Sequence, residues 1–160
     1  MRTWPGSGVW ISSSAGAGGW AVAIAQAGLA RSMAYAVGML NNVPHGAACG
    51  IAVPAVMHFN VDFATDKLAL GVSIANMDPR VSDLSGAITL ESLMESAGHP
   101  KRLSEVGVTG ESLATAPFHA LADAPALFNA RPVSDPNEVA ELFKQVWQYG
   151  QSFSPAAFLC

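Results

Sequence analysis

The sequence predicts an all-α fold, a bundle of about six helices. Three observations support this prediction. Apolar residues recur at helical spacing in several segments, no segment alternates apolar and polar residues for long, and the front third is Ala-rich and almost free of charge. The first acidic residue is Asp62, so the residues before it are expected to be mostly buried. A length of 160 residues fits one domain.

The first two helices are predicted in this apolar front part. Residues 19–40 contain no proline and are apolar nearly all round, which favours a helix in a core or an interface. Pro44 can be an early residue of a second helix over residues 45–59, because a proline there loses no hydrogen bond. Asn60 is expected to end this second helix.

Two further helices are predicted in the middle of the chain. Residues 61–76 are loosely helical in their apolar spacing, with Asp62 in the first turn, where the helix dipole favours an anion. Residues 78–86 have the composition of a turn and linker. A helix over residues 87–98 then follows, and Gly98 is expected to end it as a C-cap.

The last third is predicted to hold shorter pieces and one amphipathic helix. A helical segment begins at Thr109 as its N-cap, and Pro117 and Pro125 break it into short pieces. The amphipathic helix has Ser134 as its expected N-cap and Gly150 as its stop.

Residues 19–150 are therefore predicted to form one helical domain. The Gly/Ser-rich lead at 1–18 and the tail at 151–160 are expected to be poorly ordered unless they cover an exposed apolar face. Residues 16–21 loosely match the glycine loop of dinucleotide sites, but such sites need an acidic residue about 20 positions later. Because none occurs before Asp62, we expect no cofactor-binding residues here.

Composition and charge exclude several partners. The formal net charge is −4 and the eight Lys and Arg residues are scattered, so no basic stripe is available for nucleic acid or a membrane surface. The longest apolar runs are shorter than the roughly 18 residues of a membrane span, and no signal peptide is evident. Cys49 and Cys160 lie far apart, which fits a reducing cytoplasm better than a disulfide framework.

His45 is the first candidate for a chemical role. It lies between Pro44 and Gly46 at a predicted helix start, so its ring could face a cleft, although an isolated histidine is more often a packed or capped side chain. Catalytic zinc or iron needs three or more protein ligands. His58, at the far end of the same predicted helix, is too distant to bind the same ion. Both interpretations of His45 stay open.

Four motifs, taken in order, resemble the C-terminal helical domain of the iron-dependent (group III) alcohol dehydrogenases. They are Pro-His-Gly at 44–46, Val-Pro-x-Val-Met-x-Phe-Asn at 53–60, Leu-x-Glu-Val-Gly-Val at 103–108 and Asn-x-Arg-Pro-Val at 129–133. The resemblance covers about residues 20–148 and implies a helical fold of that type. It also implies two-domain relatives that use iron or zinc and NAD(P), with the dinucleotide site and two metal ligands in an N-terminal half that this sequence lacks.

The resemblance also points to site residues. His45 matches the last metal-ligand histidine of the family. The family's other C-terminal ligand begins a His-x-x-x-His-x-x-Gly run, which here reads Arg31, Tyr35 and Gly38. Arg31 therefore stands in place of a ligand, and Tyr35 in place of a histidine near substrate and cofactor. One imidazole cannot hold a divalent ion tightly and a guanidinium repels it, so neither a metal nor another cofactor is expected in the isolated chain.

Arg31 then has two roles open to it. It could hold a carboxylate, a phosphate or a polarised carbonyl, with Tyr35 one helical turn away as a proton donor. Alternatively, it could pair with an acid such as Asp62 or Asp66, or with a helix C-terminus, as part of the structure.

Three functional hypotheses follow. The first is an alcohol dehydrogenase-like domain of oxidoreductase lineage without intrinsic metal- or NAD-dependent activity, which would need a separate dinucleotide-binding chain for hydride transfer. The second is a metal-free enzyme that uses Arg31 as anion holder, Tyr35 as acid and His45 as base. The third is a non-catalytic helical module that forms a homo-oligomer through an exposed apolar face.

Overall fold

The computed structural model describes residues 28–64 and 94–149 of the chain. Every regular element in these two ranges is a helix, so the predicted all-α fold is confirmed there. The lead at 1–18 and the tail at 151–160 lie outside the described residues. No helix in the described ranges has both the length and the apolar character that a membrane span requires.

The first described helix, α2 (Gly28–Asn41), begins later than the sequence predicted. Gly28 has a φ of 67°, which is not α-helical, so one unbroken helix over residues 19–40 is wrong. The reason is a contact with a distant part of the chain. The Leu29 N–H donates a hydrogen bond to Asn129 Oδ1 at 3.3 Å, and a Cβ at position 28 would lie 3.2 Å from the same oxygen.

The second helix, α3 (His45–Phe59), has the predicted bounds. It is apolar on all sides, which is the pattern of a helix enclosed by other elements, and Pro54 lies buried within it. Asn60 is its C-cap, as predicted, and its backbone N–H bonds to the carbonyls of Val56 and Met57. The first turn of the helix predicted after it, at residues 61–64, is described as helical.

The remaining elements are short. They are η1 (Leu103–Val106), η2 (Ser112–Ala114), α6 (Ala116–Ala122), η3 (Ala124–Phe128), α7 (Pro136–Lys144) and the π-helical η4 (Gln145–Tyr149). Pro117 and Pro125 lie in the first turns of α6 and η3, so these prolines divide the segment as predicted. The helix after Thr109 begins at Ser112 with Glu111 as its N-cap, so the predicted N-cap at Thr109 is wrong, although the Thr109 side chain accepts a hydrogen bond from the Ser112 N–H at 3.4 Å.

Two predicted helix ends can be compared with the structure. Gly98 has a φ of 72° and closes the turn before it, with the His99 N–H bonded to the Met94 carbonyl, so its C-cap role is confirmed. The N-cap of α7 is Asp135 and not Ser134, because the Asp135 carboxylate accepts the Asn137 N–H at 2.9 Å. The predicted stop at Gly150 lies outside the described residues.

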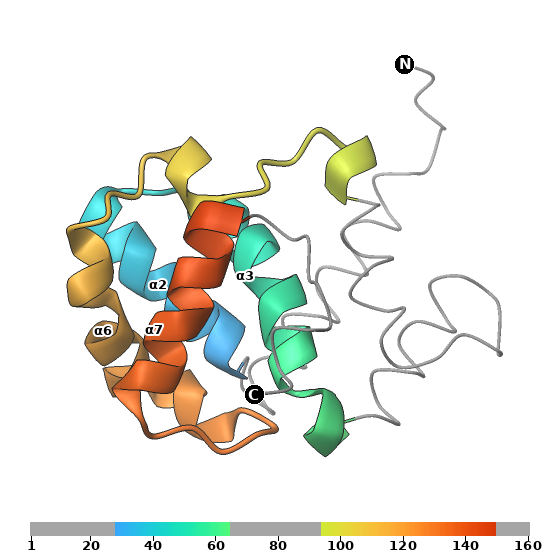
Figure 1. Cartoon of the computed structure of the whole chain (residues 1–160), viewed down its shortest axis with the longest axis vertical. Helices are drawn as coiled ribbons and strands as arrows, with labels where there is room; N and C mark the ends of the chain where they lie inside the picture. The colour runs from blue at the N-terminus through green and yellow to red at the C-terminus, as the bar shows by residue number, and fades with distance from the viewer. Residues whose placement is uncertain (1–27, 65–93, 150–160) are drawn as a thin grey trace, which may run out of the picture.

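The core forms where the main helices meet. α2 packs against α3 on one side and against α6 and η3 on the other, and α7 packs against α6 (Figure 1). The largest side chains that are fully buried come from α2, α3, η1 and α7, and include Leu29, Met33, Ile51, Leu103, Leu142 and Phe143. α2 is therefore buried on two sides, and the strip that carries Tyr35 and Met39 is left exposed.

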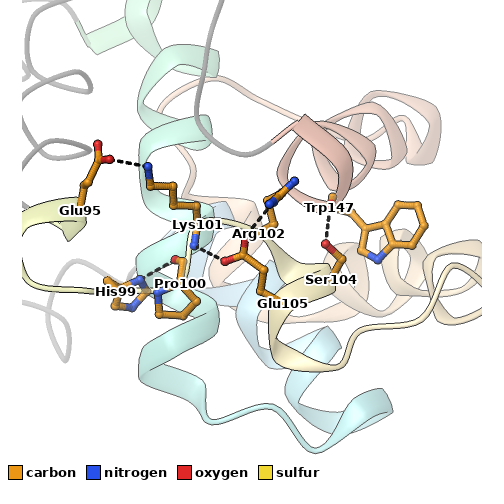
Figure 2. A network of polar contacts seen from close by, with 8 residues as sticks. All are labelled: Glu95, His99, Pro100, Lys101, Arg102, Ser104, Glu105 and Trp147. Carbon is orange, nitrogen blue, oxygen red and sulfur yellow. Dashed lines mark hydrogen bonds and ion pairs between the residues drawn. The ribbon is translucent and has the colours of Figure 1, made fainter.

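Polar contacts join the connector before η1 to η1 itself, and join η1 to η4 (Figure 2). The Glu105 carboxylate accepts hydrogen bonds from the Lys101 N–H at 3.0 Å and from the Arg102 guanidinium at 2.7 Å. The bond from Arg102 is the main cause of the lowered pKa of Glu105. Ser104 Oγ donates to the Trp147 carbonyl at 2.9 Å, and the Trp147 indole donates to the Val108 carbonyl at 2.8 Å.

We predict that alanine has opposite effects at the two glycines of α3, Gly46 and Gly50. A Cβ at Gly50 would lie 2.5 Å from the His99 ring and from Met94 Cε, so Gly50→Ala should lower the free energy of unfolding by about 1–2 kcal/mol. A Cβ at Gly46 meets nothing within 4 Å, so Gly46→Ala should raise it by up to about 1 kcal/mol. Urea denaturation would measure both, and equal effects would contradict the close contact at Gly50.

Candidate functional site

α2 places Arg31 and Tyr35 on the same face, one helical turn apart. The residues between them, from Ser32 to Ala34, are buried, whereas the Tyr35 side chain is 48% exposed. Met39, a further turn along, is 50% exposed. This face of α2 therefore points away from the core and is available to a ligand or a partner.

A short loop brings the start of α3 next to this face. Asn42 has a φ of 55°, in the left-handed region that asparagine tolerates better than most residues, and Val43 is buried after it. Gly38 lies close to the loop, since a Cβ there would be 3.4 Å from the Val43 carbonyl. α3 then begins at His45, whose side chain is exposed.

The three predicted site residues line one hollow. Its walls are Arg31, Tyr35, Gly38, Met39, Val43 and His45, and its volume is about 540 Å³. Two residues of α2 and the first residue of α3 thus face the same space. Their chemical roles stay a prediction. The three residues that the resemblance grouped lie close together in the structure.

Arg31 is paired with an acid that the sequence did not suggest. Its guanidinium lies 3.6 Å from Asp123 Oδ2, and the same oxygen accepts a hydrogen bond from the buried Ser32 hydroxyl at 2.8 Å. Of the two acids named in advance, Asp62 is exposed and is not the partner found, and Asp66 lies outside the described residues. Asp123 was missed because it is far away in the sequence, between α6 and η3.

Cys49 is a further member of this neighbourhood that the sequence did not single out. Its Sγ lies 3.4 Å from His45 Nε2, one turn along α3. Burial raises the pKa of the Cys49 thiol, and the positive charge of Arg31 partly opposes this effect. The spacing of four residues on one predicted helix was the signal that could have found the pair.

The described residues do not fit a divalent metal site of the family type. Within residues 28–64 and 94–149 no three His, Cys, Asp or Glu side chains come close enough to hold an ion together. Among the described residues, Cys49 is the potential metal ligand that contacts His45. The guanidinium of Arg31, which cannot ligate a metal, lines the same hollow as His45. His58 belongs to the opposite end of α3, and burial lowers its pKa.

Two of the sequence motifs meet at a pair of asparagines. Asn60 and Asn129 exchange two side-chain hydrogen bonds, of 3.1 and 2.7 Å. Asn129 also accepts the Leu29 N–H and donates to the Arg131 carbonyl at 2.9 Å. The Arg131 guanidinium lies over the Phe59 ring, 4.1 Å from its centroid. This asparagine pair joins the start of α2, the end of α3 and the loop after η3.

A second hollow of about 470 Å³ lies between η2, α6 and α7. Its walls are mostly apolar and include Phe118 and Trp147, with Lys144 as the charged residue. None of the predicted site residues lines it. We therefore take the hollow around Arg31 as the candidate site.

Comparison with known proteins gives a consistent result. Residues 10–147 match the model described as "Fe-containing alcohol dehydrogenase family, C-terminal". Lactaldehyde reductase of Escherichia coli (strain K12) is 30% identical over 125 residues, which cover 75% of this chain and 32% of the relative. The chain therefore spans about a third of the length of the curated relatives it matches.

Solved structures agree in fold. The crystal structure of a 1,3-propanediol oxidoreductase superposes with a TM-score of 0.66 at 27% identity, and covers 76% of this chain and 33% of its own. An alcohol dehydrogenase from Oenococcus oeni superposes with a TM-score of 0.70 at 22% identity, and covers 81% of this chain and 35% of its own. The second likeness bears on the fold alone.

Proposed function

Because the chain belongs to the Fe-containing alcohol dehydrogenase family, matching its C-terminal part, we propose that it is an oxidoreductase-lineage domain that lacks metal- and NAD-dependent activity by itself. The observation that carries this proposal is the guanidinium of Arg31 in the hollow beside His45. By resemblance, that position belongs to a metal-ligand histidine in the family. An arginine cannot ligate a metal, because it stays protonated and has no lone pair to give.

The chemistry of the remaining donors supports the same proposal. In the family, the metal acts as a Lewis acid on the substrate oxygen while hydride passes to or from the nicotinamide. Here His45 and Cys49 contact each other, no third His, Cys, Asp or Glu among the described residues joins them closely enough to hold an ion, and the charge of Arg31 opposes a cation. The glycine run at 16–21 lacks the acid that a dinucleotide site needs, so NAD(H) is also not expected to bind this chain alone.

Arg31→His is the variant that tests this proposal. It removes the positive charge and restores an imidazole in the hollow, so the affinity for Co²⁺ or Zn²⁺ should rise by about tenfold or more. Metal content by mass spectrometry after loading, together with NADH titration by fluorescence, would measure the effect. Arg102→His, at an exposed arginine paired with Glu105, is the matched control and should change nothing.

The proposal fails if the wild-type chain keeps a stoichiometric metal ion that His45→Ala removes. It also fails if the wild-type chain by itself oxidises alcohols with NAD(P). Were hydride transfer to appear only after a separate dinucleotide-binding chain is added, the domain would be one half of a two-chain enzyme.

A metal-free enzyme is the second candidate, and the shared hollow of Arg31, Tyr35 and His45 favours it. Arg31 would hold an anionic group of the substrate, Tyr35 would donate a proton and His45 would accept one. A third candidate is a non-catalytic module that self-associates. Large exposed apolar side chains, Met39 among them, favour it because they could pack against a second copy of the chain. Sedimentation of the same preparation separates the two, since a clean monomer argues against self-association.

A further inference from the structure

We infer that the hollow between α2 and the start of α3 binds a small carboxylate, with Arg31 as its charge partner and Tyr35 as a second hydrogen-bond donor. The inference rests on the proposed function, because a metal ion held at His45 would compete for the same space. It names the class of ligand that the hollow accepts. Charge, available donors and shape support it separately.

The permanent charge on the lining of the hollow is positive. Among its six lining residues Arg31 is the one with a permanent charge, and none is an acid. Asp123, the partner of Arg31, is not part of the lining and its side chain is only 18% exposed. A carboxylate entering the hollow therefore meets a cation without meeting an acid on the walls.

The Arg31 guanidinium has N–H groups that its contact with Asp123 does not use. Its contact with Asp123 is 3.6 Å, longer than a normal hydrogen bond, and the same Asp123 oxygen accepts a hydrogen bond from the Ser32 hydroxyl at 2.8 Å. The Arg31 side chain is 42% exposed. A guanidinium carries five N–H donors in a planar fork that matches a carboxylate. Arg31 can thus bind an anion without giving up its link to Asp123.

The start of α3 adds a favourable field. This helix of 15 residues begins at His45, has no acidic residue in its first turn and has no side-chain cap. The positive end of its dipole is therefore not neutralised within the helix. This field supports an anion already held by Arg31 and does not make a site without it.

Tyr35 supplies the second donor. Its side chain is 48% exposed, and its hydroxyl has no hydrogen-bond partner in the part of the chain that the structure describes. One turn of helix separates it from Arg31, a spacing of about 5–6 Å between Cβ atoms, so both can reach one small ligand. Met39 and Val43 add apolar walls. A short-chain monocarboxylate fits this combination.

Butanoate and butanamide are suitable probes, because they have the same shape and differ in charge. We expect butanoate, titrated into the full chain in the presence of EDTA and followed by NMR, to bind with a Kd on the order of 1 mM. Butanamide should bind at least about tenfold more weakly, since it lacks the charge that Arg31 recognises. Equal binding of the two probes would overturn the inference.

Variants locate the binding. Arg31→Gln should weaken butanoate binding by about tenfold and leave butanamide unchanged, and Tyr35→Phe should weaken butanoate binding by about threefold. Arg102→Gln is the matched control, because this arginine is similarly exposed but pairs with Glu105, and neither residue lines the hollow. A loss in Arg102→Gln as large as in Arg31→Gln would show non-specific attraction and refute the site.

Folding and metal content keep the outcomes distinct. If Arg31→Gln does not fold, Tyr35→Phe decides, because it removes only a hydroxyl that contacts nothing polar among the described residues. If the wild-type chain holds metal but still binds butanoate through Arg31 after EDTA treatment, the proposed function fails and this inference stands. If the chain is metal-free but does not prefer butanoate over butanamide, the proposed function stands and this inference fails.

Discussion

Replacing Asn129 with alanine is expected to lower the free energy of unfolding by about 2–4 kcal/mol. The side chain makes four hydrogen bonds, to the Leu29 N–H, to both side-chain groups of Asn60 and to the Arg131 carbonyl. Each bond has a net worth of about 1 kcal/mol, and a polar group left unpaired in a part-buried place costs about 1–3 kcal/mol. Urea denaturation followed by circular dichroism would measure the loss.

Asn137 provides the control for this prediction. Its side chain donates only to the neighbouring Asp135 carboxylate at an exposed helix start. Asn137→Ala should therefore cost about 0.5 kcal/mol or less. Asn129→Asp adds a finer test, because a carboxylate can still accept from Leu29 but cannot donate to Asn60 or to the Arg131 carbonyl. A loss of under about 1 kcal/mol in Asn129→Ala would contradict the role of the asparagine pair.

Replacing Phe143 with alanine is expected to have an equal or larger effect, about 3–5 kcal/mol. Phe143 lies on α7 and is the largest of the fully buried side chains among the described residues. Removing its ring takes away buried apolar surface and leaves a cavity that the surrounding helices cannot fully close. Thermal unfolding and urea denaturation would both report the loss.

Phe118 is the matched control, because the same ring on α6 is 61% exposed. Phe118→Ala should change the free energy of unfolding by about 1 kcal/mol or less. A similar loss in both variants would contradict the packing of the Phe143 ring into the core. Phe143→Leu should recover a large part of the stability, since it keeps much of the buried volume.

The sequence predicted part of the candidate site. Arg31 and Tyr35 share a helix face because they are four residues apart, and this follows from helical geometry alone. The resemblance to a known family grouped both residues with His45, and the structure places all three on one hollow. Asp123 could not be predicted, because its approach to Arg31 depends on how α6 and η3 pack over α2.

The same division appears in the fold. The bounds of α3 and the C-cap at Gly98 were predicted because they depend on side chains and backbone groups within a few residues of one another. The predicted start of the first helix, by contrast, was wrong, because α2 begins at Gly28. Its N-terminus is satisfied by Asn129, which is a hundred residues away and leaves no trace in the local pattern.

The sequence by itself therefore determined the helical class of the described residues, the apolar character of their helices and the family. That Arg31 stands where the family has a metal-ligand histidine stays a prediction from the resemblance. Only the tertiary structure decided where α2 begins, which acid pairs with Arg31 and that Asn60 meets Asn129. The physical reason is the distance along the sequence over which each interaction acts. Helix periodicity and capping act over one or two turns, whereas ion pairs and shared hydrogen bonds between distant segments exist only after the helices have packed.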